Sequence, residues 1–266
     1  MAIIGIDIGS STIKIIEYKD EKILSKGIFE SKNYEAIIDE FLTKNNIKKI
    51  DKIAITGINA KKVNLEKYNV PLVTVEEFDA VGTGGLYLSK KEKAIVASIG
   101  TGTALIRAEG KEFKHLGGTG VGAGTLSNLC NKFANVKSFY EIIELSKEGE
   151  LSNIDLRIAD LTDEYIETLP PELTLANFGK LSDKASKADI VLGLINMVFE
   201  IIGMMTAFAS LNDNIKDIVL IGNIVSIPVV KDVLKKIEKT HKVSFIIPEE
   251  PQFAVAIGAI ASLMNN

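Results

Sequence analysis

The sequence predicts an α/β protein built from two similar lobes that face a cleft. Each half of the chain opens with three strand-like runs and then alternates helical and strand-like segments. Both openings also contain a short turn rich in glycine, serine or threonine. The two halves are only weakly similar residue by residue, but the order of their elements is the same. We therefore expect a duplicated architecture.

In the first half, we expect three strands, a helix and two more strands. Continuous or alternating apolar residues favour the strands, while the spacing of Ile38, Phe41 and Leu42 favours a helix. The expected strands are residues 2–7, 12–18, 23–29, 52–56 and 71–75, and the expected helix is 34–42.

The second half repeats this order and adds helices. The tight turn Gly100-Thr101-Gly102 separates its first two strands, and residues 148–173 are the least periodic stretch, expected on the surface. We expect residues 1–90 to form the N-terminal lobe and residues 91–266 the C-terminal lobe. The expected strands are 93–99, 104–108, 113–116, 217–221 and 243–246; the expected helices begin near 123 or cover 138–146, 182–211, 228–237 and 253–264.

Composition excludes several classes of protein. The 266 residues are 46% hydrophobic and 25% charged, as in a globular protein, and the net charge of −4 argues against nucleic-acid binding. The single cysteine, Cys130, excludes internal disulfides, and with only two histidines a Cys/His zinc cluster is excluded too. Arg107 and Arg157 are the only arginines, so bidentate binding of phosphate or carboxylate is nearly unavailable.

One apolar segment, residues 190–211, is long enough to cross a membrane. Glu200 lies in its middle, where an unpaired carboxylate would be costly in hydrocarbon. The preceding Ser182-Asp183-Lys184-Ala185 is typical of a polar helix start. We therefore expect a buried or subunit-packing helix and no membrane partner. With no targeting segment visible, the protein is expected in the cytoplasm.

The first candidate site is the octapeptide Asp7-Ile8-Gly9-Ser10-Ser11-Thr12-Ile13-Lys14. An acid leaves a strand, a Gly/Ser turn exposes backbone N–H groups, and a lysine lies on the next strand. Such a turn can bind phosphate oxygens while Asp7 faces a bound Mg²⁺, directly or through water, and Lys14 supplies positive charge. The alternative is an ordinary hairpin in which Gly and Ser only supply turn conformations.

The second candidate site is a glycine-rich stretch. Eight of the 21 glycines lie between Gly100 and Gly124, and residues 117–125 separate a strand from an apolar helix. Glycine lets the backbone approach a charged ligand, and a helix N-terminus attracts anions. With Thr101 and Thr103 nearby, we expect a second phosphate loop that converges with the first on one nucleotide. A Rossmann site is disfavoured because no acid follows on a second parallel strand about 20 residues later.

The third candidate is Thr74-Val75-Glu76-Glu77-Phe78-Asp79-Ala80. A carboxylate here could take the proton of an alcohol that attacks a γ-phosphate. Alternatively, Thr74 and Glu77 form a capping box for a helix that begins near Phe78, and the residues alone do not decide. Ser/His/Asp hydrolysis has little support, since neither His115 nor His241 lies near a nucleophile-elbow pattern.

Together these segments resemble the type II pantothenate kinases, in order and spacing, over nearly the whole chain. The segments that carry the resemblance are the octapeptide, Glu77-Phe78-Asp79-Ala80, Gly100-Thr101-Gly102-Thr103, the alternating glycines from Gly118 to Gly124, Leu175-Ala176-Asn177-Phe178-Gly179 and Ala256-Ile257-Gly258-Ala259.

The resemblance implies an actin/hexokinase-like (ribonuclease H-like) fold with two lobes around an ATP cleft. It also implies a homodimer that uses Mg²⁺ and ATP to phosphorylate the primary hydroxyl of pantothenate, the first step of coenzyme A biosynthesis. Glu77 falls on the family's catalytic base, and Asp7 is the expected Mg²⁺ ligand. The implied ATP-binding residues are Asp7, Ile8, Gly9, Ser10, Ser11, Thr12, Ile13, Lys14, Thr101, Gly122, Ala123, Gly124, Thr125, Leu126, Phe139 and Asn223. The implied substrate-binding residues are Glu77, Thr101, Ala104 and His115.

Three positions depart from the family pattern. The family's arginine that helps to bind the pantothenate carboxylate is His115 here, which forms charge-assisted hydrogen bonds only while protonated. Ala104 stands where the family usually has serine, and Phe139 replaces a tyrosine of the nucleotide side, unless the register shifts to Tyr140. The chemistry is therefore better supported than the substrate, and pantetheine or another pantoyl-like alcohol is the alternative acceptor.

Two further alternatives remain. One is an ATPase activator of the acyl-CoA dehydratases, which share the Gly-Ile-Asp-Ile-Gly-Ser-Ser start. Those proteins hold an iron–sulfur cluster between subunits with cysteines, and the single Cys130 disfavours this reading. The other is a nucleotide-binding regulator or scaffold that has lost catalysis, which the carboxylate of Glu77 disfavours.

Overall fold

The chain forms two large sheets, a small ribbon and seven α-helices in the part that the computed structural model describes, residues 1–20, 22–45, 49–64, 66–162 and 170–264. The strands are β1 Ala2–Ile8, β2 Thr12–Lys19, β3 Lys22–Glu30, β4 Lys52–Thr56, β5 Leu72–Thr74, β6 Lys93–Ile99, β7 Thr103–Glu109, β8 Glu112–Thr119, β9 Leu156–Arg157, β10 Thr174–Ala176, β11 Asp217–Gly222 and β12 Ser244–Ile246. The helices are α1 Tyr34–Lys44, α2 Glu77–Ser89, α3 Ala123–Ala134, α4 Phe139–Glu148, α5 Lys187–Asp213, α6 Val230–His241 and α7 Ala254–Met264.

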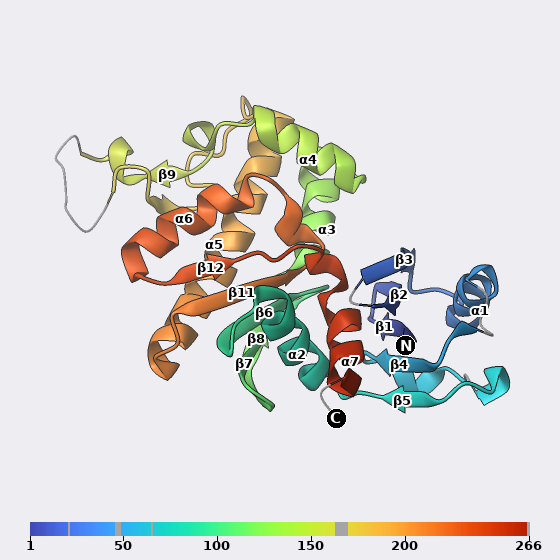
Figure 1. Ribbon diagram of the computed structural model, residues 1–266. Helices are drawn as coiled ribbons and strands as arrows, with labels where there is room; N and C mark the ends of the chain where they lie inside the picture. Colours follow the sequence, from blue (N-terminus) through green and yellow to red (C-terminus); the bar gives the residue numbers. More distant parts are fainter. Residues whose placement is uncertain (21, 46–48, 65, 163–169, 265–266) are drawn as a thin grey trace.

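The two large sheets have the same topology (Figure 1). The first has the order β3-β2-β1-β4-β5, and the second, read from its other end, has the order β8-β7-β6-β11-β12. In each, three antiparallel strands are followed by two strands parallel to the first. The duplicated α/β architecture predicted from the sequence is confirmed.

The first strand, β1, is buried on both faces, and the alternation of side chains along it determines the face on which Asp7 lies. Ile4, Ile6 and Ile8 pack in the core beneath α1. Gly5 lies against α7, where an added Cβ would be 2.6 Å from the carbonyl oxygen of Ala256. Because side chains alternate along a strand, Asp7 shares the α7 side with Gly5. The carboxylate therefore leaves β1 on the face turned toward the second lobe.

Each large sheet is covered by a helix from the other half of the chain, so α2 and α7 are exchanged between the sheets. α2 packs on β6, β7, β8 and β11, whereas α7, from the end of the chain, packs on β1, β2 and β4. The two helices meet between the sheets (Figure 1), and glycine allows their backbones to touch. A Cβ added at Gly84 would lie 2.0 Å from the oxygen of Ala254, and one at Gly258 would lie 1.9 Å from that of Ala80. The division into lobes at residue 90 stays a prediction.

The long apolar helix α5 is mostly buried inside the protein. Within the described residues it is the one helix long and apolar enough to cross a membrane, but 67% of that apolar window is buried, as in a core helix. It begins at Lys187, later than the expected residue 182. Ser186 and Asp189 form a capping box there, in which each side chain accepts a hydrogen bond of 3.0 Å from the other residue's backbone N–H.

Residues 148–173, which show no periodic pattern, are attached to the core and do not lie wholly on the surface. Ile154 and Asp155 are completely buried, and β9 pairs with β10 in a short antiparallel ribbon. Residues 163–169 of this stretch lie outside the described residues. Buried anchors at single positions leave no periodic pattern, which is why the sequence predicted only a surface excursion.

Candidate active site

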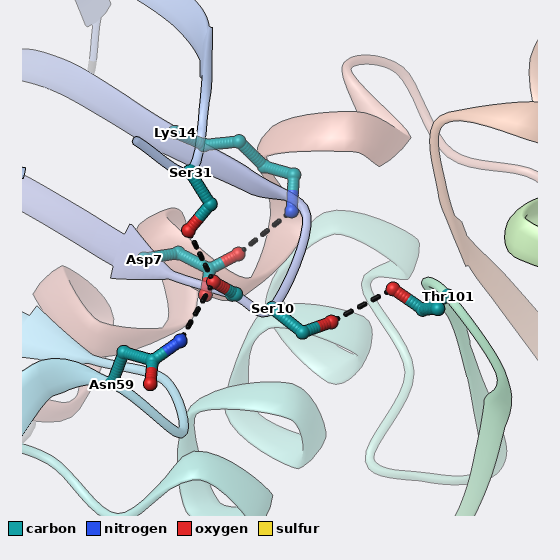
Figure 2. A network of polar contacts seen from close by, with 7 residues as sticks. Asp7, Ser10, Lys14, Ser31, Asn59 and Thr101 are labelled. Carbon is teal, nitrogen blue, oxygen red and sulfur yellow. Dashed lines mark hydrogen bonds and ion pairs between the residues drawn. The ribbon is translucent and has the colours of Figure 1, made fainter. Parts of the chain in front are cut away.

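Asp7 and Lys14 face each other across the first hairpin. They are cross-strand partners in the β1–β2 register, and the Lys14 Nζ lies 2.9 Å from the Asp7 Oδ2 (Figure 2). Both side chains are largely withdrawn from solvent, with exposed fractions of 16% for Lys14 and 7% for Asp7. The ion pair therefore holds both charges in a fixed direction at the end of β1.

The turn between these strands is braced by the first lobe. The Gly9 N–H donates to the Thr12 carbonyl at 3.0 Å. The Gly9 carbonyl accepts from the Ser31 hydroxyl at 2.8 Å and from the Asn59 side-chain amide at 3.1 Å (Figure 2). Sequence reasoning missed Ser31 and Asn59. Asn59 follows β4, which runs parallel beside β1, and that pairing was the only signal available for it.

Thr101, in the β6–β7 turn, joins the two lobes. Its Oγ1 lies 2.7 Å from the Ser10 Oγ and 2.8 Å from the Ser11 Oγ (Figure 2 shows the Ser10 contact). Three hydroxyls from two turns therefore meet at one place between the lobes. Because a hydroxyl both donates and accepts, all three can rotate toward the oxygens of a bound anion.

The glycine-rich stretch closes against the same β6–β7 turn. The Ala123 N–H donates to the Gly100 carbonyl at 2.8 Å, and the Gly124 N–H donates to the Thr101 carbonyl at 3.1 Å. Two N–H groups at the start of α3 are thus bonded to protein. In this arrangement the beginning of α3 holds the turn that carries Thr101.

The glycines of this stretch differ in what surrounds them. Gly118 and Gly122 are required by packing, since an added Cβ would lie 2.2 Å from the Thr103 oxygen or 2.8 Å from the Gly100 oxygen. At Gly120, by contrast, an added Cβ would meet no described atom within 4 Å. Gly120 is exposed and has no left-handed backbone angle. Open space beside the backbone is what a closely approaching ligand needs.

Glu77 is the first residue of α2. The N-cap is Glu76, whose side chain makes no capping hydrogen bond, so the capping box predicted as an alternative for Thr74 and Glu77 is wrong. A capping box requires the acid at the third helical position, and α2 begins with Glu77 itself. Its carboxylate is therefore not used as a helix cap.

The charges of the first hairpin act on Glu77. Although the residue keeps solvent contact, partial burial of its carboxyl raises the pKa of Glu77. The negative charge of Asp7 raises this pKa further, and the positive charge of Lys14 lowers it. Glu77 thus lies within electrostatic range of the Asp7–Lys14 pair. A carboxylate with a raised pKa is a stronger base once it is ionised.

His115, on β8, stacks on Phe78, the residue that follows Glu77. The ring centroids are 4.3 Å apart and the planes differ by 10°. Phe78 is 40% exposed, and His115 is exposed as well. Ala104 lies on β7 and pairs with Gly118 of β8. Sequence reasoning selected His115 but missed Phe78 as its partner.

Comparison with known proteins identifies the family. Residues 93–237 match the family described as Fumble. Over 229 residues the chain is 30% identical to a type II pantothenate kinase of Bacillus cereus (strain G9842), covering 83% of each chain. This chain belongs to the type II pantothenate kinase family. The resemblance found in the sequence motifs is therefore confirmed.

Solved structures show how widely the kinase family's fold is shared. The chain is similar to the activator of the 2-hydroxyisocaproyl-CoA dehydratase from Clostridium difficile with bound ADPNP, with a TM-score of 0.71 and 17% identity, covering 100% of this chain and 95% of that one. It is also similar to the ROK hexokinase from Thermus thermophilus, with a TM-score of 0.59 and 13% identity over all of both chains. The fold is the two-lobed actin/hexokinase-like fold.

Several residues that the family resemblance assigned to ATP binding offer only backbone atoms. The side chains of Ile8, Ile13 and Leu126 are completely buried in the cores of the two lobes. The Thr125 hydroxyl donates to the Gly120 carbonyl at 2.9 Å, which steadies the open side of the glycine-rich stretch. Ile8, Ile13 and Leu126 can therefore contribute only backbone atoms to a phosphate site.

Phe139 and Asn223 lie in the second lobe. Phe139 begins α4 and packs against the core, whereas Tyr140 is 72% exposed. Asn223 follows β11, whose last residue, Gly222, is paired with Ile99 at the end of β6. Asn223 therefore leaves the sheet at the same edge as the β6–β7 turn, where ligands of α/β sheets commonly bind.

The family motif at residues 175–179 is held against α5. The Phe178 N–H donates to the buried Asp155 carboxylate at 2.8 Å, and the Asn177 amide donates to Glu200 of α5 at 2.8 Å. Asn196, also on α5, donates to Asp155 at 3.0 Å. Burial raises the pKa of Asp155, and the hydrogen bond from Phe178 opposes this. The motif thus fixes the β9–β10 ribbon to the long helix.

Proposed function

We propose that this protein transfers the γ-phosphoryl group of ATP to the primary hydroxyl of pantothenate, the first step of coenzyme A biosynthesis. The observation that carries the proposal is the position of Glu77, a carboxylate within electrostatic range of Asp7 and Lys14 at the start of α2. Family membership supports the same reaction, because the Bacillus cereus relative is a type II pantothenate kinase.

In this proposal the two turns hold the phosphates. The hydroxyls of Ser10, Ser11 and Thr101, which now bond to one another, turn toward phosphate oxygens. The open backbone at Gly120 lets the chain approach a phosphate, and Asn223 contacts the nucleoside end. Nucleotide binding therefore replaces the hydrogen bonds among these hydroxyls with hydrogen bonds from the hydroxyls to phosphate oxygens.

The carboxylate of Asp7 fits a magnesium ion bound together with ATP. Among the described residues, no three His, Cys, Asp or Glu side chains are grouped to hold a metal by themselves. Mg²⁺ commonly uses one or two carboxylates, with phosphate oxygens and waters completing its shell. Asp7 offers one such carboxylate, directly or through water. When bound, the ion neutralises charge on the β- and γ-phosphates.

Glu77 acts as the general base. Its ionised carboxylate accepts the proton of the acceptor hydroxyl as that oxygen bonds to the γ-phosphorus and the bond from phosphorus to the ADP oxygen breaks. Lys14 stays paired with Asp7 and offsets negative charge at the phosphates. Thr101, in the β6–β7 turn, positions the acceptor hydroxyl and the phosphate relative to each other.

We further propose a cytoplasmic homodimer. α5 carries a row of half-buried or exposed apolar side chains at alternating spacings of four and three residues, the spacing of a packed helix pair. This row, the α5 seam, consists of Met197, Ile201, Met204, Phe208 and Leu211. A second copy of the chain, with the same seam related by a two-fold axis, is the partner that covers it.

The activator alternative is less well supported. The likeness to the Clostridium difficile activator shows the fold alone. Cys130 is completely buried, and burial raises the pKa of its thiol to about 12. A protonated thiol inside the core cannot serve a cluster held between subunits.

A turnover assay tests the proposed function. Purified protein is supplied with Mg²⁺ and ATP and with pantothenate, pantetheine or a set of sugar alcohols, and ADP release is measured. We expect ADP release with a pantoyl alcohol and none above background with the sugar alcohols. Turnover with sugar alcohols alone contradicts the acceptor, and nucleotide binding without turnover on any alcohol supports a non-catalytic regulator.

A further inference from the structure

Thr56 is the last residue of β4, and its side chain is completely buried. Its hydroxyl has no hydrogen-bond partner among the described residues. The other serines and threonines buried in the described part of the chain each donate to a backbone carbonyl; they are Thr103, Ser146, Thr206 and Ser210. A buried hydroxyl without a partner costs free energy, and an exception of this kind often marks a functional group. Thr56 is therefore a candidate for a role that folding does not require.

Thr56 lies beside Asp7, at the same level of the first sheet. The parallel β1–β4 register pairs Asp7 with Thr56, and the antiparallel β1–β2 register pairs Asp7 with Lys14. Ala54, two residues before Thr56, packs in the core cluster that includes α7, so Thr56 lies on the α7 side of the sheet, as Asp7 does. Lys14, Asp7 and Thr56 therefore form a row on one face, with Asp7 in the middle.

The end of β4 is fastened to the end of β1. A Cβ added at Gly57, whose φ is +100°, would lie 2.6 Å from the Ile8 carbonyl oxygen. The Asn59 N–H donates to the same oxygen at 3.2 Å, and its side-chain amide donates to the Gly9 carbonyl at 3.1 Å. These contacts fix Thr56 relative to Asp7. Because neighbouring strands are about 5 Å apart, a rotation of the two side chains brings the hydroxyl within hydrogen-bond distance of the carboxylate.

The Asp7 carboxylate is bound on the β2 side of this row. The Lys14 Nζ lies 2.9 Å from the Asp7 Oδ2 (Figure 2), whereas the Thr56 hydroxyl lies on the β4 side. An ionised carboxylate has about four lone-pair sites, so it can accept from Lys14 and from a hydroxyl at the same time. Carboxylates that serve a metal ion are commonly held in one orientation by such hydrogen bonds. Thr56 can supply this hold on the side opposite Lys14.

We propose that Thr56 is a positioning residue for Asp7: with Mg²⁺ and ATP bound, its hydroxyl donates to the Asp7 carboxylate from the side opposite Lys14. The inference rests on the role of Asp7 in the proposed function. Without nucleotide, the unpartnered hydroxyl lowers the stability of the protein. Removing the hydroxyl should therefore raise stability and weaken magnesium-dependent binding of ATP. A merely structural hydroxyl would not give these opposite responses.

The experiment uses T56V, which keeps the shape of the side chain without the hydroxyl, and T56S, which keeps the hydroxyl. The control is T206V, because Thr206 is also completely buried but donates to the backbone of its own helix. Calorimetric titration gives the Kd of ATP with Mg²⁺ and with EDTA, and the ratio of the two values is the magnesium gain. T56V should lower this gain by about 10-fold, as expected for one hydrogen bond to a charged group. T56S and T206V should stay within about 2-fold of the wild type.

Thermal unfolding of the protein without nucleotide gives the second readout. T56V should raise Tm by about 2–4 °C, because it removes a buried hydroxyl that has no partner. A lower Tm in T56V, or failure of this variant to fold, would mean that the hydroxyl is already bonded in the protein without nucleotide, and the inference would be wrong.

The titrations also decide against the inference if the magnesium gain is absent in the wild type, unchanged in T56V, or lost equally in T206V. Because they require no acceptor, they are independent of turnover. A protein that shows the expected gains but phosphorylates no alcohol would refute the proposed function and leave the role of Thr56 standing.

Discussion

Glu77 is a residue at which activity and stability are expected to oppose each other. The folded protein raises the pKa of its carboxyl, so ionisation is easier in the unfolded chain than in the folded one. The stabilising contribution is complete below the unfolded pKa of about 4.3 and is lost as pH rises through the raised folded value. At neutral pH the ionised carboxylate therefore lowers stability.

Replacing Glu77 with glutamine separates these two effects. E77Q should retain nucleotide binding, lose phosphoryl transfer by about 10²–10⁴-fold, and raise Tm at pH 7. The gain in Tm should disappear below about pH 4, where the wild-type carboxyl is also neutral. Thermal unfolding at several pH values and steady-state turnover measure both effects, with E76Q as the control at the N-cap. Near wild-type turnover in E77Q would mean that Glu77 is not the base.

Residues close together in sequence were easier to predict than residues joined by the fold. The acid, the turn and the lysine of the first hairpin span eight positions, so their proximity follows from strand pairing alone. The bonds from Ser31 and Asn59 to Gly9, and the stacking of His115 on Phe78, join elements far apart in the chain. The pairing of β4 with β1 and of β3 with β2 sets the first two contacts, and the packing of α2 against β8 sets the third, so no local spacing encodes them.

Among the elements, α2 and α7 depend most strongly on small residues. Their backbones meet at Gly84 and Gly258, where a Cβ would lie about half a normal contact distance from a carbonyl oxygen. In the described residues, all ten strands of the large sheets and six of the seven helices were predicted in order, whereas α2 was considered only as part of the capping-box alternative. The exchange of α2 and α7 was not predicted, because the apolar face of a helix does not specify which sheet covers it.

A pair of glycine-to-alanine variants tests the helix crossing against the proposed phosphate site. G258A should lower the free energy of unfolding by about 1–3 kcal/mol, since the helices must move apart to admit the methyl group. G120A, where the methyl group meets no described atom, should leave stability nearly unchanged and weaken ATP binding instead. Denaturant unfolding and nucleotide titration measure the two effects. An equal loss of stability in G258A and G120A would contradict the different roles proposed for these two glycines.

At the scale of the whole molecule, one small contact joins the two lobes at the proposed phosphate position. Thr101 bonds to Ser10 and Ser11 of the other lobe, while α2 and α7 pack against each other between the two sheets (Figure 1). A duplicated fold places the two turns opposite each other because each follows the first strand of its own sheet. This symmetry was predictable from the repeated order of elements, although the direct hydroxyl contact was not.

We also expect the whole protein to form a dimer through α5. The seam along α5 is partly buried at Met197, Ile201 and Met204, but Leu211 is exposed and Phe208 is 57% exposed, and neighbouring exposed apolar side chains favour self-association. We expect a dimer at micromolar concentration by light scattering, with a Tm that rises with protein concentration. The double variant M204K/F208K should be monomeric, because two lysines on each copy would place four charges in one apolar interface. F133K is the matched control, since Phe133 is 60% exposed on α3 and lies outside the seam. If the wild type is a monomer at micromolar concentration, the α5 seam does not mediate assembly. The same conclusion follows if F133K dissociates the dimer as fully as M204K/F208K does.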